Sequence, residues 1–157
     1  MKHRAEGGVP QNGCAMNEIA GLFHHRETRL GVFYPTGHIV AIFRSFNAAH
    51  SAQESLLHAG FADEESHAAP GSEVLEYFDQ LTEETGVWGR LMTEFSRVID
   101  TEAAFADNDI RQARRGAGFL FVRCLNDHAA ERIRDLVLPC RPLAMQWYTA
   151  GAVQSMV

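Results

Sequence analysis

Cysteine is scarce in this sequence and is not arranged as a covalent or metal-binding framework. The three cysteines, Cys14, Cys124 and Cys140, are odd in number, and no pair has the two-residue separation of a zinc or redox motif. This pattern excludes a disulfide-stabilised scaffold and a zinc knuckle. We therefore expect a protein of the reducing cytoplasm.

Long hydrophobic runs are also lacking. No apolar run approaches the roughly 18–20 residues that a spanning helix needs, and the first residues lack the apolar core of a secretory signal. The sequence therefore predicts a cytoplasmic protein with no membrane partner.

An excess of positive charge is absent as well. Twenty acidic residues against fourteen basic ones give a formal net charge of −6. Such a field repels phosphate backbones, so we expect no nucleic-acid partner.

The remaining composition is that of a globular protein. Of the 157 residues, 46% are hydrophobic and 22% are charged, which predicts a single core that folds unaided. Residues 1–37 hold no period for long and are expected to be an extension, partly disordered or docked, in which Met16 offers a later translation start. Residues 38–150 are expected to form the domain and 151–157 a C-terminal tail.

The first half of this domain alternates strand and helix. Residues 38–46 (HIVAIFRSF) form an apolar, β-rich run, and Asn47 is expected to cap a following amphipathic helix that Gly60 ends. A weak return strand is predicted at residues 65–69, before Pro70 and Gly71.

The second half repeats this pattern after a helical insert. Apolar spacing predicts helices throughout residues 72–115, broken near Gly86 and Gly89. The pattern then predicts a strand at 118–125, a helix at 127–138 capped by Asp127, and a last strand at 143–149.

Two such strand–helix–strand units predict the fold. Right-handed crossovers are expected to bring the two strands of each unit side by side, giving an α+β, ferredoxin-like split βαβ sandwich with helices on one face and a helical insert between the halves. The other sheet face must then be shielded, which makes a homodimer the expected assembly unless the insert or the extension covers it. Several aromatic residues are expected either in the core or lining such a surface or cleft: Trp88, Phe119, Phe121, Trp147 and Tyr148.

Two stretches carry a family resemblance. Ala41 to Ser45 followed by Ala59-Gly60-Phe61, and later IRQARRGAGFLFVRC, resemble the heat-induced stress protein (YflT-like, general stress protein) domain family of bacteria over residues 38–150. The resemblance implies a small cytoplasmic protein with no established chemistry and no agreed catalytic residues. The sequence departs from the family at residues 139–142 (Pro-Cys-Arg-Pro), where a glycine-alanine turn is usual.

Arginines form the constellation of most interest. Arg111, Arg114 and Arg115 precede a glycine, where cations complement the end of a helix dipole. The alternative is that they bind a small anionic ligand together with Arg44 or Arg123, which occupy equivalent positions in two apolar strands.

Cysteine chemistry is a weaker candidate. A nucleophile would be Cys124 or Cys140 with His128 and Asp127. Cys124 lies in an apolar strand and is expected to be buried, whereas Cys140, beside Arg141, is the candidate for redox sensitivity.

Histidines suggest metal binding only by their number. His50 and His58 lie about two helical turns apart, roughly 12 Å, too far to hold one ion. We expect no metal and no cofactor, and we expect solvated or capping roles for the main group of histidines: His24, His25, His38, His50, His58 and His67.

Two functional hypotheses follow. The first is a non-enzymatic, stress-associated or regulatory domain that acts by self-association or by binding a small ligand. The alternative is a small enzyme of the ferredoxin-like or dimeric α+β-barrel type, with its pocket between sheet and helices. The fold alone does not choose between them.

Overall fold

The computed structural model describes residues 28–29, 32–33, 36–79 and 115–157 of the chain. Near the start, β1 (Thr28–Arg29) and β2 (Val32–Phe33) pair with each other in a small antiparallel sheet. The predicted helices at residues 80–114 lie outside the described residues.

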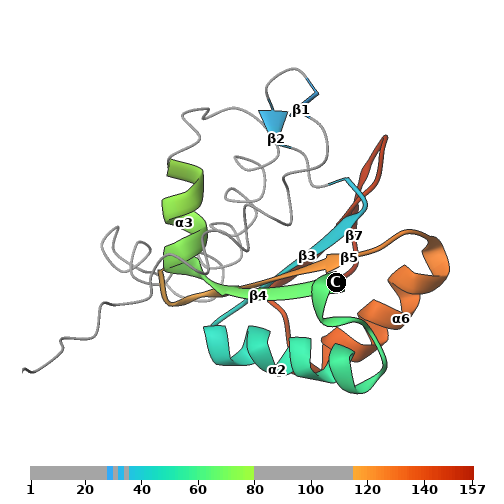
Figure 1. Cartoon of the computed structure of the whole chain (residues 1–157), viewed down its shortest axis with the longest axis horizontal. Coiled ribbons are helices and arrows are strands. Elements are labelled where there is room, and N and C mark those ends of the chain that lie inside the picture. Colours follow the sequence, from blue (N-terminus) through green and yellow to red (C-terminus); the bar gives the residue numbers. More distant parts are fainter. Residues whose placement is uncertain (1–27, 30–31, 34–35, 80–114) are drawn as a thin grey trace, which may run out of the picture.

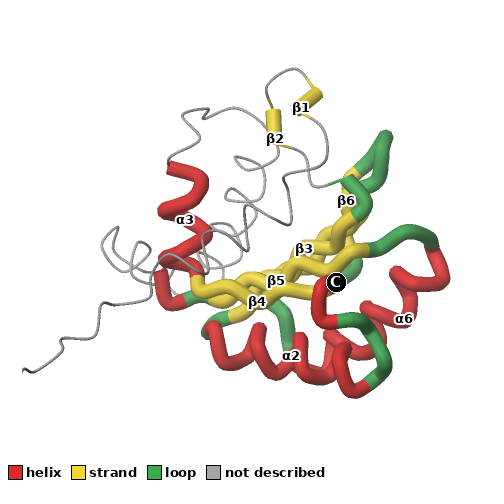
Figure 2. Tube along the Cα trace, in the orientation of Figure 1, coloured by secondary structure: helices red, strands yellow, loops and turns green. Residues whose placement is uncertain are grey.

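The described domain is α+β and is built on one five-stranded antiparallel sheet (Figures 1 and 2). Its strands are β3 (His38–Phe43), β4 (Ser66–Pro70), β5 (Gly118–Arg123), β6 (Ala144–Tyr148) and β7 (Val153–Ser155). Its helices are α2 (Phe46–His58), α3 (Gly71–Asp79) and α6 (Asp127–Val137), with short 3₁₀ turns η1 (Asp63–Glu65) and η2 (Leu138–Cys140). Among these described helices, none is long and apolar enough to cross a membrane.

The strands of the two units interleave. The order across the sheet is β4-β5-β3-β6-β7, so β5 separates the strands of the first unit and β3 those of the second. The prediction that each pair lies side by side is therefore wrong. A helix about 10 Å wide spans two strand spacings of about 4.8 Å, which leaves room for one strand between the two that it joins.

A strand that the sequence pattern did not reveal completes the sheet. Residues 151–157, expected to be a tail, contain β7, which pairs with β6 so that Val153 lies opposite Tyr148 and Ser155 opposite Gln146. The sheet therefore has five strands instead of the predicted four. Only three residues long, β7 carries too little alternation to be recognised.

Helix α2 begins earlier than predicted and ends where predicted. Ser45, not Asn47, is the N-cap: its backbone is extended, and its hydroxyl accepts a hydrogen bond from the Ala48 amide at 3.3 Å. The first residue after the strand with a suitable side chain takes this position. Gly60, with a φ of 94°, ends the helix as predicted.

The end of α2 is a Schellman motif. The amide of Gly60 donates to the Leu57 carbonyl at 3.0 Å, and that of Phe61 donates to the Leu56 carbonyl at 3.1 Å. This pattern satisfies two carbonyls of the last turn and requires the left-handed residue that glycine supplies. Phe61 is thereby placed against the core.

Helix α6 is likewise capped one residue earlier than predicted. The side chain of Asn126 accepts a hydrogen bond from the Ala129 amide at 2.9 Å, and Asp127 is the first helical residue. Either residue type is a good cap, so composition alone does not separate them.

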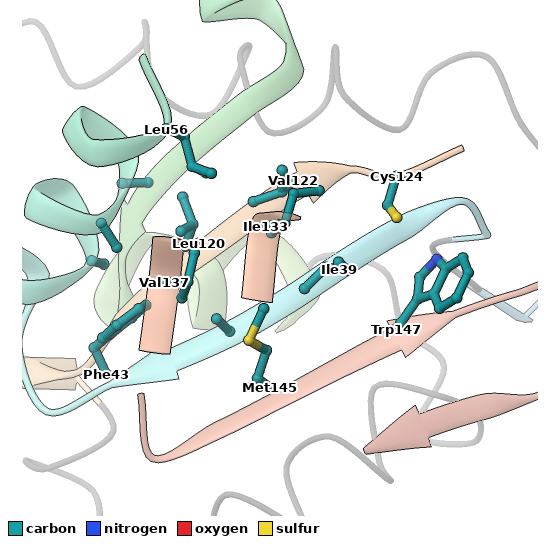
Figure 3. Packing of buried hydrophobic residues seen from close by; sticks show 14 of the residues in the cluster. Ile39, Phe43, Leu56, Leu120, Val122, Cys124, Ile133, Val137, Met145 and Trp147 are labelled. Atoms are coloured by element: carbon teal, nitrogen blue, oxygen red, sulfur yellow. The ribbon is translucent and has the colours of Figure 1, made fainter. Parts of the chain in front are cut away.

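Helices α2 and α6 cover one face of the sheet, and the core lies between (Figure 3). Arg132 of α6 joins the two helices, since it donates to the Ala59 carbonyl at 3.3 Å and lies 5.1 Å from the centroid of the Phe61 ring. The buried core side chains are Ile39, Ala41, Phe43, Ala49, Ala52, Leu56, Ala68, Leu120, Val122, Cys124, Ala130, Ile133, Val137, Met145 and Trp147.

The opposite face of the sheet is also buried within the single chain. Its central side chains, Val40, Ile42, Phe119 and Phe121, are at most 1% exposed. Helix α3 lies on this side and contacts β4 and β5 (Figure 1). These four side chains therefore do not form an exposed apolar surface, and the homodimer that such a surface would favour stays a prediction.

One glycine is required by the close packing of α2 on the sheet. A Cβ atom at Gly118 of β5 would lie 2.8 Å from both the Phe46 Cα and the Ala49 Cβ, and would also meet the Ser45 carbonyl oxygen. Two of these atoms are backbone, so relief would require the start of α2 to move. Gly118 thus sets how closely the helix approaches the sheet.

Replacement of Gly118 by alanine should therefore destabilise the fold. We expect Gly118→Ala to lower the free energy of unfolding by about 1–3 kcal/mol through overpacking, measured by urea denaturation. Gly116→Ala is the matched control, because nothing lies within 4 Å of its Cβ position. An equal loss in both variants would contradict the steric explanation.

Candidate functional site

A row of three polar side chains crosses the central strands at one end of the sheet. His38 of β3 lies opposite Arg123 of β5 on one side and opposite Tyr148 of β6 on the other. Side chains directly opposite one another across antiparallel strands have Cβ atoms about 4.5–5.5 Å apart. These residues form a continuous polar row on the face away from α2 and α6.

The members of the polar row differ in exposure. Tyr148 is 1% exposed, and its hydroxyl donates to Oε1 of Gln146 at 2.8 Å. His38 is half-buried, and its Nδ1 lies 3.2 Å from the Thr36 carbonyl oxygen, which favours the tautomer with the hydrogen on Nδ1. Arg123 is exposed at the end of its strand.

This arrangement suits recognition of a small anion. The Arg123 guanidinium offers a planar fork of donors to a carboxylate or phosphate, and the neighbouring imidazole adds a positive charge when protonated. The next residues along this face, Val40 and Phe121, are apolar and 1% exposed, so they pack inside the chain and the accessible part of the row is its polar end.

The structure separates the arginines that the sequence groups together. Arg123 lies opposite His38, whereas Arg44 follows Phe43, which lies opposite Gly118 at the other end of the strand pair. Six residues at about 3.4 Å each put the two backbones roughly 20 Å apart. Arg44 and Arg123 therefore do not share one ligand, because equivalent positions in antiparallel strands lie at opposite ends.

The arginine cluster before β5 is described only in part. Arg115 is exposed and lies just before the start of β5, at the end of the sheet where Arg44 lies. Arg111 and Arg114 lie outside the described residues. A site that joins Arg115 to Arg123 is excluded by their separation along the strand.

The cysteine–histidine arrangement is not supported at Cys124. This side chain is 1% exposed, and burial raises the pKa of its thiol above the ordinary value of 9.0, an effect to which the Asp127 carboxylate adds. A thiol held in its neutral form is a poor nucleophile. His128 is exposed on α6. Cys140 is half-buried at the end of η2 and packs against the core.

The histidines of α2 point to solvent. His50 and His58 are both exposed, and Nδ1 of His50 lies 3.9 Å from a carboxylate oxygen of Glu54. Within residues 36–79 and 115–157, no three or more histidine, cysteine or acidic side chains are grouped so as to hold a metal ion. His24 and His25 lie outside the described residues.

Sequence reasoning did not assign His38, Tyr148 and Gln146 to a site with Arg123. They are brought together by strand register, which pairs residues more than eighty positions apart in the chain. A signal was present in the polar residues that interrupt the otherwise apolar strands at 38, 123, 146 and 148. Without the register, these interruptions could not be related to one another.

The chain was compared with known proteins in three ways. Models of protein families, curated proteins and solved structures give no match to it. Inference about function therefore rests on the geometry of the described residues and on the sequence resemblance, which stays a prediction.

Thiol labelling should separate the two described cysteines. We expect Cys140 to react with a maleimide at least tenfold faster than Cys124 under native conditions, because Cys124 is buried and its pKa is raised. Peptide mapping by mass spectrometry gives each rate, and urea-unfolded protein is the control in which both should react alike. Equal native rates would contradict the buried position of Cys124.

The raised pKa of Cys124 also predicts a pH dependence of stability. The folded state keeps the thiol proton to a higher pH than the unfolded chain, so this contribution is complete below the ordinary pKa of 9.0 and is lost as pH rises through the higher folded value. We expect the difference in unfolding free energy between wild type and Cys124→Ala to shrink above pH 9.0. Urea denaturation over a pH series measures it, and a difference that grows instead would contradict the assignment.

Proposed function

We propose that this chain is a cytoplasmic, non-enzymatic regulatory domain, stress-associated as its resemblance implies, that binds a small anionic ligand at the polar row. The observation that carries the proposal is the exposed guanidinium of Arg123 in direct register with His38. The ligand class is a small carboxylate or phosphate.

Electrostatics support a specific site over general attraction. The whole chain carries a net charge of −6, which disfavours anions at most of its surface. The Arg123 guanidinium lies at the end of β5, beside His38, whose ring is oriented by the Thr36 carbonyl. Its positive charge locally offsets the repulsion of anions by the rest of the chain. Selectivity would then come from the geometry of Arg123 and His38.

The ferredoxin-like arrangement is part of the same proposal. Support comes from the interleaving of β3-α2-β4 with β5-α6-β6, in which the first strand of each unit lies inside the sheet. In this interpretation β7 is an addition at the edge beside β6. Sheets of this type leave one face free of the crossover helices, which is the face that carries the polar row.

The alternative, an enzyme with a pocket between sheet and helices, has less support. Among the described residues, the side chains that fill this space are buried and apolar, and Cys124 there has a raised pKa.

Anion binding can be tested with inorganic phosphate as the probe. We expect calorimetric titration to show saturable binding, weakened at least tenfold in Arg123→Gln, because one charge-assisted hydrogen-bonding group contributes about 1.5–3 kcal/mol. Arg115→Gln, which removes an exposed arginine at the other end of β5, should bind within about twofold of wild type.

The control for ionic strength is sodium chloride at matched concentration. Binding that falls equally in both variants would indicate general charge attraction and contradict the proposed site. If the wild-type protein bound neither inorganic phosphate nor a short-chain fatty acid, the proposed anion site itself would be contradicted.

A further inference from the structure

The two edges of the main sheet differ in how their outer backbone groups are satisfied. At the β4 edge, the Gln53 side chain donates to the Ser66 carbonyl at 2.8 Å and accepts from the Ala68 amide at 3.3 Å. It thus occupies the places that a neighbouring strand would take. Pro70, two residues further along β4, has no N–H to offer. Another strand is therefore blocked from pairing with β4.

Among the described residues, no side chain bonds the outward backbone groups of Val153 and Ser155 on the β7 edge, and the Ser155 hydroxyl donates to the Val157 carbonyl at 3.1 Å. The Thr149 amide donates to the Ala152 carbonyl, and the Met156 amide donates to the Met145 carbonyl, both at 2.9 Å. The backbone N–H and C=O groups of the even-numbered residues in this segment therefore point toward β6. Alternation along a strand turns the N–H and C=O of Val153 and Ser155 outward. The strand is accessible, because Gln154 and Ser155 are exposed and Val153 is half-buried.

Charge that would repel a partner is also missing from this edge. Residues 142–157 contain no charged side chain, although the chain as a whole has fourteen basic and twenty acidic residues. Proteins usually protect an exposed edge strand by making it very short or by placing a charge, a proline or a bulge on it. The three-residue β7 is protected by its shortness alone, whereas the opposite edge is closed by Gln53 and Pro70.

We propose that β7 pairs antiparallel with β7 of a second copy of this chain, about a two-fold axis that passes beside Gln154. The outward groups of Val153 in one copy then hydrogen-bond those of Ser155 in the other, and each Gln154 lies opposite the other Gln154. Two five-stranded sheets become one ten-stranded sheet. A second copy of this chain fits as the partner, because antiparallel pairing of two β7 strands satisfies the outward N–H and C=O groups of both strands in the same way.

Closure of the assembly follows from the blocked β4 edge. Pairing of β7 with β4 of another copy would be head-to-tail and would propagate into filaments. Because Gln53 and Pro70 obstruct β4, association stops at the dimer. The pairing of three-residue strands buries little surface, so we expect weak, concentration-dependent association.

This interface goes beyond anion binding but adjoins its site. Val153 lies opposite Tyr148, so the polar row of Arg123, His38 and Tyr148 ends one strand away from the proposed two-fold axis. In the dimer, the two rows lie on the same continuous sheet, one on each side of the axis. The two proposals depend on different residues and can fail separately.

Pairing through β7 is tested by sedimentation velocity, which measures the oligomeric state at protein concentrations of about 5–500 µM, where weak dimers are populated. Wild type should shift from monomer to dimer as concentration rises. Ser155→Pro removes an outward N–H without removing a bond to β6, and should weaken dimerisation at least tenfold. Ser155→Ala, which keeps the N–H, is the matched control and should dimerise like wild type. Circular dichroism verifies that both variants fold.

The register of the two β7 strands is tested by charged substitutions at Gln154, the residue beside the two-fold axis. Gln154→Lys and Gln154→Glu place like charges opposite each other, so each variant alone should dimerise at least tenfold more weakly than wild type. An equimolar mixture should form a heterodimer at least as stable as the wild-type dimer, since the opposed charges then attract. A mixture that stays monomeric would overturn the Gln154 register.

Three further results would bear on the proposed β7 dimer and the anion site. A wild-type dimer that Ser155→Pro leaves intact would overturn pairing through β7 while leaving self-association in place. Monomer at every concentration, or oligomers larger than a dimer, would overturn the proposed closed assembly. Phosphate binding by the monomer would in either case leave the anion site standing.

Discussion

The pairing of β3 with β5 is the interaction on which the rest of this structure depends. All six residues of each strand are in register, from His38 opposite Arg123 to Phe43 opposite Gly118, and their central side chains are buried on both faces of the sheet. The same register places an exposed cation beside His38 and a glycine under the start of α2. It also carries Arg44 away from Arg123, so only one of these arginines belongs to the polar row.

Helix α2 connects this pairing to the behaviour of the sheet edges. It covers one face through Ala49, Ala52 and Leu56, and it is held close to β5 because Gly118 has no side chain. From this position Gln53 reaches the edge of β4 and satisfies two of its backbone groups. One edge of the sheet is thus closed by a helix, and the other edge ends in a short strand without charged residues.

The hydrophobic pattern of the sequence predicted most of the described strands and helices, but it was imprecise about helix N-caps, where several neighbouring residues are suitable. The runs predicted as strands at 38–46 and 118–125 contain β3 and β5, which end earlier, at Phe43 and Arg123. The amphipathic helices predicted after these two strands are α2 and α6, and the weak return strand is β4. The caps were misplaced by one or two residues, since Ser45 and Asn47, or Asn126 and Asp127, have similar capping ability. Of the predicted anion-binding residues, Arg123 lies in the polar row, whereas Arg111 and Arg114 lie outside the described residues.

By itself, the sequence determined the α+β class, the order of strands and helices along the chain, and the burial of Cys124, because hydrophobic periodicity and side-chain size act over a few neighbouring residues. Only the tertiary structure decided that the two units interleave, that Tyr148 and Arg123 flank His38, and that β7 forms an edge. These features depend on register between segments more than a hundred residues apart, such as His38 and Tyr148, and register is set by how the whole sheet packs against its helices.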